Sequence, residues 1–187
     1  MLDLIICPDE ALLQPSLPVD FESEDITHLK KTIKNMKQIM YKYDGVGLAA
    51  VQLGIYKQII ITDCSYDVDN KDTRNTKIYI NPKIIAKRGE KVPMTEGCLS
   101  CPGVYVDVIR YPEITVEYFD LDGKKHTHDL TELDAHCLQH EIDHLSGKTL
   151  FQVCVPEKRI QVLQDYLQKI SLYEDPRVLN QTHDLNN

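Results

Sequence analysis

Two histidines and the glutamate between them, His140, Glu141 and His144, form the sharpest chemical pattern in the sequence. On an α-helix, residues four apart lie on one face, about 6 Å apart along the axis. Both imidazoles can therefore reach one metal ion, and the carboxylate of Glu141 can exchange a proton with a water molecule beside it. Because such a short pattern also arises by chance, two surface histidines on a polar helix remain an alternative.

A catalytic metal ion usually takes three protein ligands and keeps one coordination position open. One large class of metalloproteases supplies the third ligand from a histidine after the helix, but Leu150 stands at that position here. The thiol of Cys98 is the predicted third ligand, because Gly97 before it lets the backbone approach a metal or substrate closely. Cys98 and Cys101 also form a Cys-x-x-Cys pair, so a structural zinc pair or a redox dithiol are alternatives, although the chain has no second such pair.

Residues 45–52 form a loop rich in glycine and alanine, which suits a backbone that lies against a ligand. Gln52 ends this loop, and its side-chain amide can polarise a carbonyl oxygen. The loop lacks the Lys-Ser/Thr pair of a phosphate loop and no strand precedes it, so nucleotide binding is not expected.

Helices and strands must bring these candidate site residues together, and the spacing of apolar residues predicts where those helices and strands lie. Apolar residues recur at three- and four-residue steps over 26–40, which predicts an amphipathic helix that starts at 23–25 and stops at 44–45. β-Branched runs predict strands at 58–62, 77–81, 104–109 and 114–119. Helices are predicted at about 130–145 and after Pro156, the latter with Ile160, Leu163, Leu167 and Ile170 on one face.

The predicted fold class is α+β, with small mixed or antiparallel sheets around a central metal-binding helix and a helix near each end. We expect a single catalytic domain at residues 1–173 and a polar C-terminal tail at 174–187. Within the central helix the histidines continue an inward-facing stripe with Leu133 and Cys137. We therefore predict that Leu133, His136, Cys137 and Val46 line an apolar pocket beside the metal ion.

The charge and the apolar content of the chain argue against some classes of function. The 187 residues include 21 basic and 29 acidic side chains, a formal net charge of −8, which argues against binding DNA through its phosphates. The first residues lack the features of a secretory signal, and no apolar run approaches the roughly 18–20 residues needed to span a bilayer. We expect a cytoplasmic protein without a membrane segment, whose six cysteines are reduced thiols.

Three segments together resemble the peptide deformylase family. They are Gly45-x-Gly47-Leu48-Ala49-Ala50-x-Gln52, Glu96-Gly97-Cys98-Leu99-Ser100 and Gln139-His140-Glu141-x-Asp143-His144-Leu145-x-Gly147. Their order and spacing are similar to those of the family, and the resemblance runs from about Pro8 through the last helix. Each motif alone is of limited specificity, whereas all three in register are very specific.

The resemblance implies a hydrolase that removes the N-terminal formyl group from formyl-methionine of nascent polypeptides and releases formate. It implies Cys98, His140 and His144 as metal ligands and Glu141 as the catalytic acid and base. Gln52 and the backbone N–H of Leu99 would form the oxyanion hole.

The same resemblance implies that Val46, Gly47 and Gly97 flank a cleft in which the substrate backbone pairs like an added strand. Glu96 and Arg110 resemble the supporting ion pair of the family. Fe(II) is the implied physiological metal, with Zn(II), Ni(II) or Co(II) as alternatives, and the C-terminal helix is the implied contact with the ribosome.

The sequence departs from familiar bacterial members at Cys101, at residues 103–105 and at His136, which bears on substrate preference and not on the chemistry. Two other functions explain part of the pattern. A metallopeptidase for ordinary peptide bonds has no use for the Cys98 and Gln52 segments. A binding protein with a structural zinc site leaves Glu141 without a role.

Overall fold

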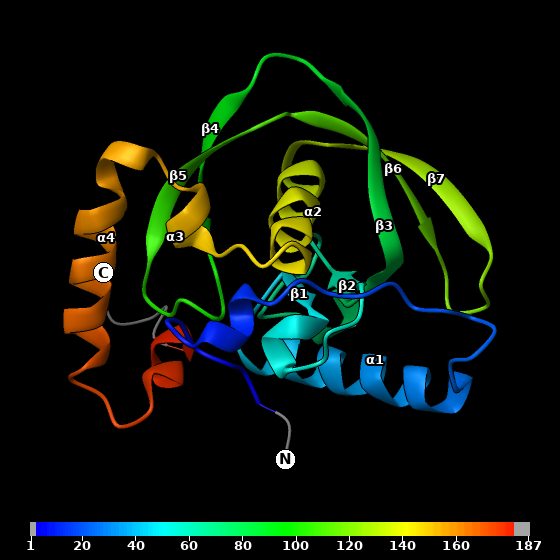
Figure 1. Cartoon of the computed structure of the whole chain (residues 1–187), viewed down its shortest axis with the longest axis horizontal. Coiled ribbons are helices and arrows are strands. Elements are labelled where there is room, and N and C mark those ends of the chain that lie inside the picture. The colour runs from blue at the N-terminus through cyan, green and yellow to red at the C-terminus, as the bar shows by residue number, and fades with distance from the viewer. Residues whose placement is uncertain (1–2, 182–187) are drawn as a thin grey trace.

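The computed structural model describes residues 3–181, which form two antiparallel sheets around a central helix, α2 (Glu132–Leu145) (Figure 1). The larger sheet has the order β1-β2-β3-β6-β7, formed by Gly47–Ala49, Ile59–Thr62, Lys77–Arg88, Glu113–Phe119 and Lys125–Thr131. The smaller sheet pairs β4 (Val92–Gly97) with β5 (Tyr105–Arg110). Three further α-helices surround the sheets: α1 (Ile26–Lys42), α3 (Leu150–Val153) and α4 (Arg159–Ile170). Short 3-10 helices lie at Glu10–Leu13, Ala50–Leu53, Lys71–Thr73, Pro156–Lys158 and Pro176–Gln181. The predicted fold class is confirmed.

A long double-stranded ribbon carries the chain over α2. β3 continues through a turn at Gly89 into β4, and β5 leads back into β6. Because β3 pairs with β6 and β4 with β5, the ribbon arches over α2 and places β4 across the helix from the larger sheet (Figure 1). The sequence prediction ended the strand at 77–81 before Pro82. β3 instead continues to Arg88 because a register shift between Ile80 and Lys83 accommodates the proline.

Helix α1 forms where the apolar periodicity predicted it. The Asp25 carboxylate accepts a hydrogen bond from the Thr27 N–H at 2.8 Å and caps the start of the helix. Ile33, Met36 and Met40 are buried in the core between α1 and the first strands. This packing fixes the point at which the chain leaves α1 and enters the glycine-rich loop before β1.

Helix α4 confirms the predicted element, and the core covers only part of its apolar face, where Leu163 and Ile170 pack. Ile160 is 72% exposed and Leu167 40% exposed, whereas Tyr166 is 1% exposed. The Tyr166 hydroxyl donates a hydrogen bond to the carbonyl oxygen of Cys7 at 2.7 Å, which turns this side of the helix toward the core. The outward face of α4 therefore carries two apolar side chains.

The remainder of the chain adds a 3-10 helix, η5 (Pro176–Gln181), which returns toward the N-terminal segment (Figure 1). Residues 182–187 of the predicted tail lie outside the described part, and the domain boundary at 173 stays a prediction. Among residues 3–181, no helix is long and apolar enough to cross a membrane.

Candidate metal centre

Two elements bring the three predicted ligands together. Helix α2 carries His140 and His144 one turn apart, and Cys98 follows directly after β4. The Cys98 Sγ atom lies 3.2 Å from Nε2 of His144, and one donor atom of each of the three residues lies within 4.8 Å of the others. The two imidazoles point to the same side of α2, as the four-residue spacing requires.

A buried ion network orients His140. Its Nδ1 atom lies 2.9 Å from the Glu96 carboxylate, so the Nε2 atom is left for a metal ion. Arg110 binds Glu96 through Nε and, at 2.9 Å, through Nη2, and it reaches Asp143 on α2 at 2.7 Å. Burial by itself raises the pKa of Glu96, but the hydrogen bonds from Arg110 and His140 outweigh burial and hold this pKa below its ordinary value. Glu96 is therefore an anion that fixes the imidazole.

The environment of Cys98 favours its thiolate form. A hydrogen bond from the Cys101 thiol and the nearby imidazoles hold the pKa of Cys98 well below its ordinary value, against the opposing effect of burial. A thiolate is the form of cysteine that binds metal ions. Cys101 is itself buried, with its sulfur 2.9 Å from that of Cys7, so Cys101 supports the site and is not one of the three converging ligands.

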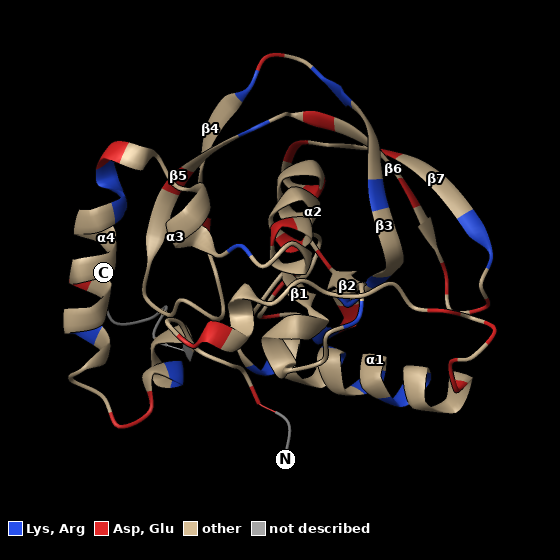
Figure 2. Cartoon of the chain, in the orientation of Figure 1, with Lys and Arg blue, Asp and Glu red and all other residues tan. Residues whose placement is uncertain are grey.

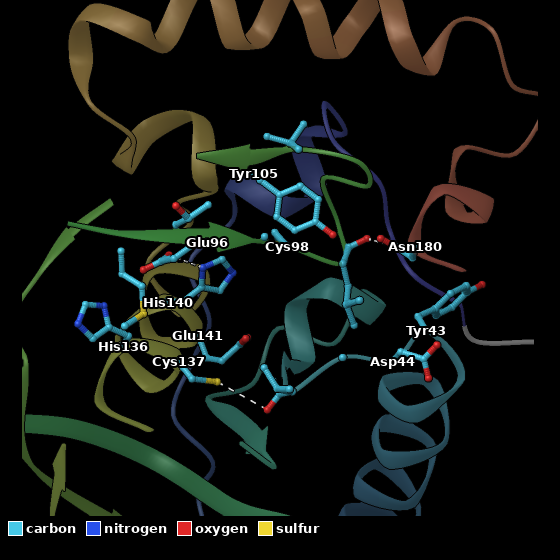
Figure 3. A pocket seen from close by; sticks show the side chains of 18 of the residues that line it. Tyr43, Asp44, Glu96, Cys98, Tyr105, His136, Cys137, His140, Glu141 and Asn180 are labelled. Carbon is cyan, nitrogen blue, oxygen red and sulfur yellow. Dashed lines mark hydrogen bonds and ion pairs between the residues drawn. The ribbon is translucent and has the colours of Figure 1, made fainter. Parts of the chain in front are cut away.

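Glu141 lies at the base of the cleft with 4% of its surface exposed (Figure 3). Its Oε2 atom makes no hydrogen bond within residues 3–181. Burial raises the pKa of Glu141 to about 7, although the neighbouring imidazoles of His140 and His144 oppose this effect. A carboxyl group with a pKa near neutrality can both accept and return a proton.

The glycine-rich loop lies directly against this carboxyl group. A Cβ atom at Gly47 would meet Oε1 of Glu141 at 2.5 Å and the Cys137 sulfur at 2.8 Å, so any other residue would displace one of these side chains. Gln52, at the end of the loop, is 1% exposed, and its Oε1 atom accepts a hydrogen bond from the Ala49 N–H at 2.8 Å. The Gln52 Nε2 atom is consequently turned toward Cys98 Sγ, 3.8 Å away.

A cleft with a cavity volume of about 270 Å³ opens onto these groups. The residues predicted to bind substrate or to stabilise the oxyanion all line it: Val46, Gly47, Gln52, Gly97, Leu99, Leu133, His136 and Cys137. Leu133 is 46% exposed at the rim, whereas His136 is 2% exposed and its Nδ1 atom finds no partner among the described residues. Burial lowers the pKa of His136, so this imidazole is neutral near pH 7.

The donor set and its surroundings fit a metal ion. One thiolate and two imidazoles form a common ligand set for divalent transition metals. The buried Glu141 Oε2 atom without a protein partner lies beside these ligands, where a cation and its water would offset the cost of burying a charge.

The sequence assigned no role to three contributors to the centre, although the first two stand in the motifs. Asp143 completes the Arg110 network, and its place three residues after His140 on the helix was a usable signal. Ser100 accepts a hydrogen bond from Gln52 Nε2 at 3.1 Å. Asn180, in η5, also lines the cleft, and no local pattern in the sequence indicates it.

Comparison with known proteins agrees with this geometry. The sequence model of the polypeptide deformylase family matches residues 1–160. Peptide deformylase from Rhizobium meliloti (strain 1021) is 39% identical over 163 residues, which covers 87% of this chain and 90% of that protein. The chain belongs to the polypeptide deformylase family.

Solved structures of deformylases share the fold. A peptide deformylase from Synechococcus elongatus, in complex with actinonin, has a TM-score of 0.80 and 36% identity, and the match covers 94% of this chain and 90% of that one. A peptide deformylase from Legionella pneumophila has a TM-score of 0.78 and 32% identity over 94% and 99% of the two chains.

The protein is therefore an enzyme, a hydrolase that removes the N-terminal formyl group from nascent peptides, and its site takes one metal ion.

Proposed function

We propose that this deformylase hydrolyses the formyl amide with Glu141 as the proton carrier and with Cys98, His140 and His144 as the metal ligands. The observation that carries the proposal is the buried Glu141 carboxyl, with a pKa raised to about 7, beside the three converging ligand atoms. A bound divalent ion supplies Lewis-acid chemistry, which polarises the formyl oxygen and makes water more acidic.

In the proposed mechanism, Glu141 takes a proton from the water that attacks the formyl carbon. The same carboxyl group then delivers this proton to the nitrogen of the departing amine, so that one residue acts as base and as acid. Gln52 Nε2 and the backbone N–H of Leu99 donate hydrogen bonds to the formyl oxygen as it becomes negative. The position of Gln52 Nε2 near Cys98 supports this role.

The substrate backbone would lie in the cleft as an additional strand. Within residues 3–181, β1 pairs only with β2 and β4 pairs only with β5, so each strand has an edge without a partner strand. Gly47 and Gly97, on these two strands, keep side chains away from the cleft. The first side chain of the substrate, methionine, would enter the pocket lined by Leu133, His136 and Cys137.

Fe(II) is the metal we propose for the physiological enzyme. A thiolate and two imidazoles also accept Zn(II), Ni(II) and Co(II), so the ligand set supports a labile divalent ion without selecting one. Purification in air is expected to reduce activity through oxidation of iron, and Ni(II) is expected to restore it. Equal specific activity of protein purified with and without oxygen would contradict the assignment of iron.

The decisive experiment measures formate release from formyl-Met-Ala-Ser by protein purified without oxygen. Wild-type protein is expected to release formate, and both the Glu141→Ala variant and a metal-stripped sample are expected to be inactive. Fe(II) or Ni(II) should restore the stripped sample but not the variant. An unblocked Met-Ala-Ser peptide serves as the control for general peptidase activity, and its cleavage would favour a metallopeptidase.

We further propose that the enzyme acts in the cytoplasm and meets nascent chains at the ribosome through α4. Ile160 and Leu167 on the outward face of this helix support docking. Of the nearby cations, Arg159 and Lys169 already bind backbone carbonyl oxygens at 2.7 and 3.1 Å, whereas Lys158 is exposed. Cosedimentation with ribosomes should be lost in Ile160→Asp, and retention by this variant would contradict docking through α4.

A further inference from the structure

The loop that carries the Cys98 ligand is held through its backbone carbonyl groups. The N–H of Cys101 donates to the carbonyl oxygen of Cys98 at 2.9 Å, which closes the loop on itself. The N–H of Cys7 donates to the carbonyl oxygen of Ser100 at 2.7 Å, so the N-terminal segment holds the far side of the loop. The carbonyl group between these two belongs to Leu99, and its partner comes from the other end of the chain.

That partner is Asn180. Its Nδ2 atom donates a hydrogen bond to the carbonyl oxygen of Leu99 at 2.9 Å, and the residue is 8% exposed. Figure 3 shows Asn180 reaching the cleft from the C-terminal segment, and Tyr43 and Asp44 line the same cleft. A buried side-chain amide that binds one particular backbone carbonyl group restricts that peptide unit, because leaving either group unpaired costs free energy.

The C-terminal segment is itself fixed to the protein near this contact. The Arg177 side chain binds Asp175 at 2.7 Å and lies 3.5 Å from both the Leu4 carbonyl oxygen and the Asp3 carboxylate. The segment is thus joined to the N-terminal segment, which in turn holds the same loop. It lies beyond residue 160, where the match to the deformylase family ends.

We propose that Asn180 is a positioning residue for the deformylation reaction, which holds Leu99 so that its N–H points at the developing oxyanion. The N–H and the carbonyl group of Leu99 flank one α-carbon, so a bond to the carbonyl oxygen restricts rotation about that carbon. Gly97, two residues earlier, gives the preceding backbone more freedom than any other residue would. The bond from the Cys101 N–H holds the peptide plane that contains the Leu99 N–H, and the contact from η5 holds the next plane, so that both sides of the Leu99 α-carbon are restrained. The inference rests on the proposed role of Leu99 in the oxyanion hole.

The test compares kcat and KM for formate release from formyl-Met-Ala-Ser by full-length protein in one metal form. Asn180→Asp keeps the side-chain shape but, as a carboxylate, has no hydrogen to donate to the Leu99 carbonyl oxygen. Asn180→Ala removes both the donor and the bulk. Val178→Ala is the matched control, because Val178 lies in the same 3-10 helix and is 42% exposed.

Both Asn180 variants are expected to lower kcat about 10-fold with KM within about twofold. Deleting an oxyanion donor costs about 10²–10³ in rate, and loosening a donor that is still present costs less. Val178→Ala should retain the kcat and KM of the wild type. The split between kcat and KM matters, because an oxyanion contact forms in the transition state and contributes little to binding of the ground state.

Three results would overturn the inference: an unchanged kcat in both Asn180 variants, a rise in KM alone, or an equal loss of kcat in Val178→Ala. A rise in KM alone would make Asn180 a substrate contact instead of a positioning residue. Thermal unfolding identifies any variant that is not folded at the assay temperature, in which case the other Asn180 variant decides. The proposed function fails separately, because it fails only if the wild-type enzyme or its Glu141→Ala control behaves contrary to expectation.

Discussion

Replacing Glu141 with glutamine is expected to change how the free energy of unfolding of the metal-free enzyme depends on pH. Burial raises the pKa of this carboxyl group from its ordinary value of 4.5 to about 7. A carboxyl group with a raised pKa in the folded protein binds its proton more tightly there than in the unfolded chain. Below pH 4.5 both states carry the proton, so Glu141 costs the wild type nothing through ionisation.

The penalty develops as the pH rises. Between pH 4.5 and 7 the unfolded chain loses this proton while the folded protein retains it, so the wild type becomes less stable. The difference between 7 and 4.5, at 1.36 kcal/mol for each pKa unit, gives a full penalty of about 3 kcal/mol above pH 7. At pH 5 the penalty is about 1 kcal/mol.

Urea unfolding in the presence of a chelator at pH 5 and pH 8 measures the effect. Glutamine does not ionise, so Glu141→Gln should gain about 2 kcal/mol over the wild type between the two pH values. Any constant cost of the glutamine cancels in this comparison. Glu157→Gln, at an exposed carboxylate, is the control and should show no such gain. Parallel stability curves for wild type and Glu141→Gln would refute the reasoning from burial.

Three further substitutions test the architecture of the site. Arg110→Met should destabilise the protein by about 3–5 kcal/mol in urea unfolding, because it leaves the buried Glu96 carboxylate without its cation, and wild-type stability would contradict this. Gly47→Ala should lower kcat by at least about 10-fold in the formate assay with little change in thermal stability, because the new methyl group displaces the Glu141 carboxylate, and wild-type kcat would show that the loop yields instead. Leu133→Trp should raise KM for formyl-methionine peptides with kcat nearly retained, and an unchanged KM would remove Leu133 from the pocket.

The local part of the site could be predicted from sequence, because it depends on short-range geometry. Four-residue spacing on a helix places His140 and His144 on one face whatever surrounds them. The same reasoning located α1 with its Asp25 cap, and identified α2 as the helix that holds the ligands. The choice of Cys98 as third ligand depended on chemistry and on resemblance to a family, and the structure brings its sulfur to 3.2 Å from His144.

Other elements escaped prediction because distant residues decide them. β4 has an exposed, proline-containing sequence without clear alternation, and it is a strand because β5 pairs with it across the top of α2. The apolar face of α4 did not show which of its side chains are covered, because Tyr166 lies inward with its bond to the carbonyl oxygen of Cys7 while Ile160 and Leu167 are exposed. A helical pattern identifies an apolar face, but the partner surface selects which side chains are covered.

The sequence by itself determined the chemistry of this protein: which residues can bind a metal ion, which can carry a proton, and which segments keep side chains out of the way. Only the tertiary structure decided how that chemistry is held. The chain of contacts from Asp143 through Arg110 and Glu96 to His140 joins α2 to the hairpin of β4 and β5, more than 30 residues earlier in the sequence. The hydrogen bond from Asn180 to Leu99 joins residues 81 positions apart. Such contacts leave no periodic trace in the sequence, because they form only after the sheets and helices have packed.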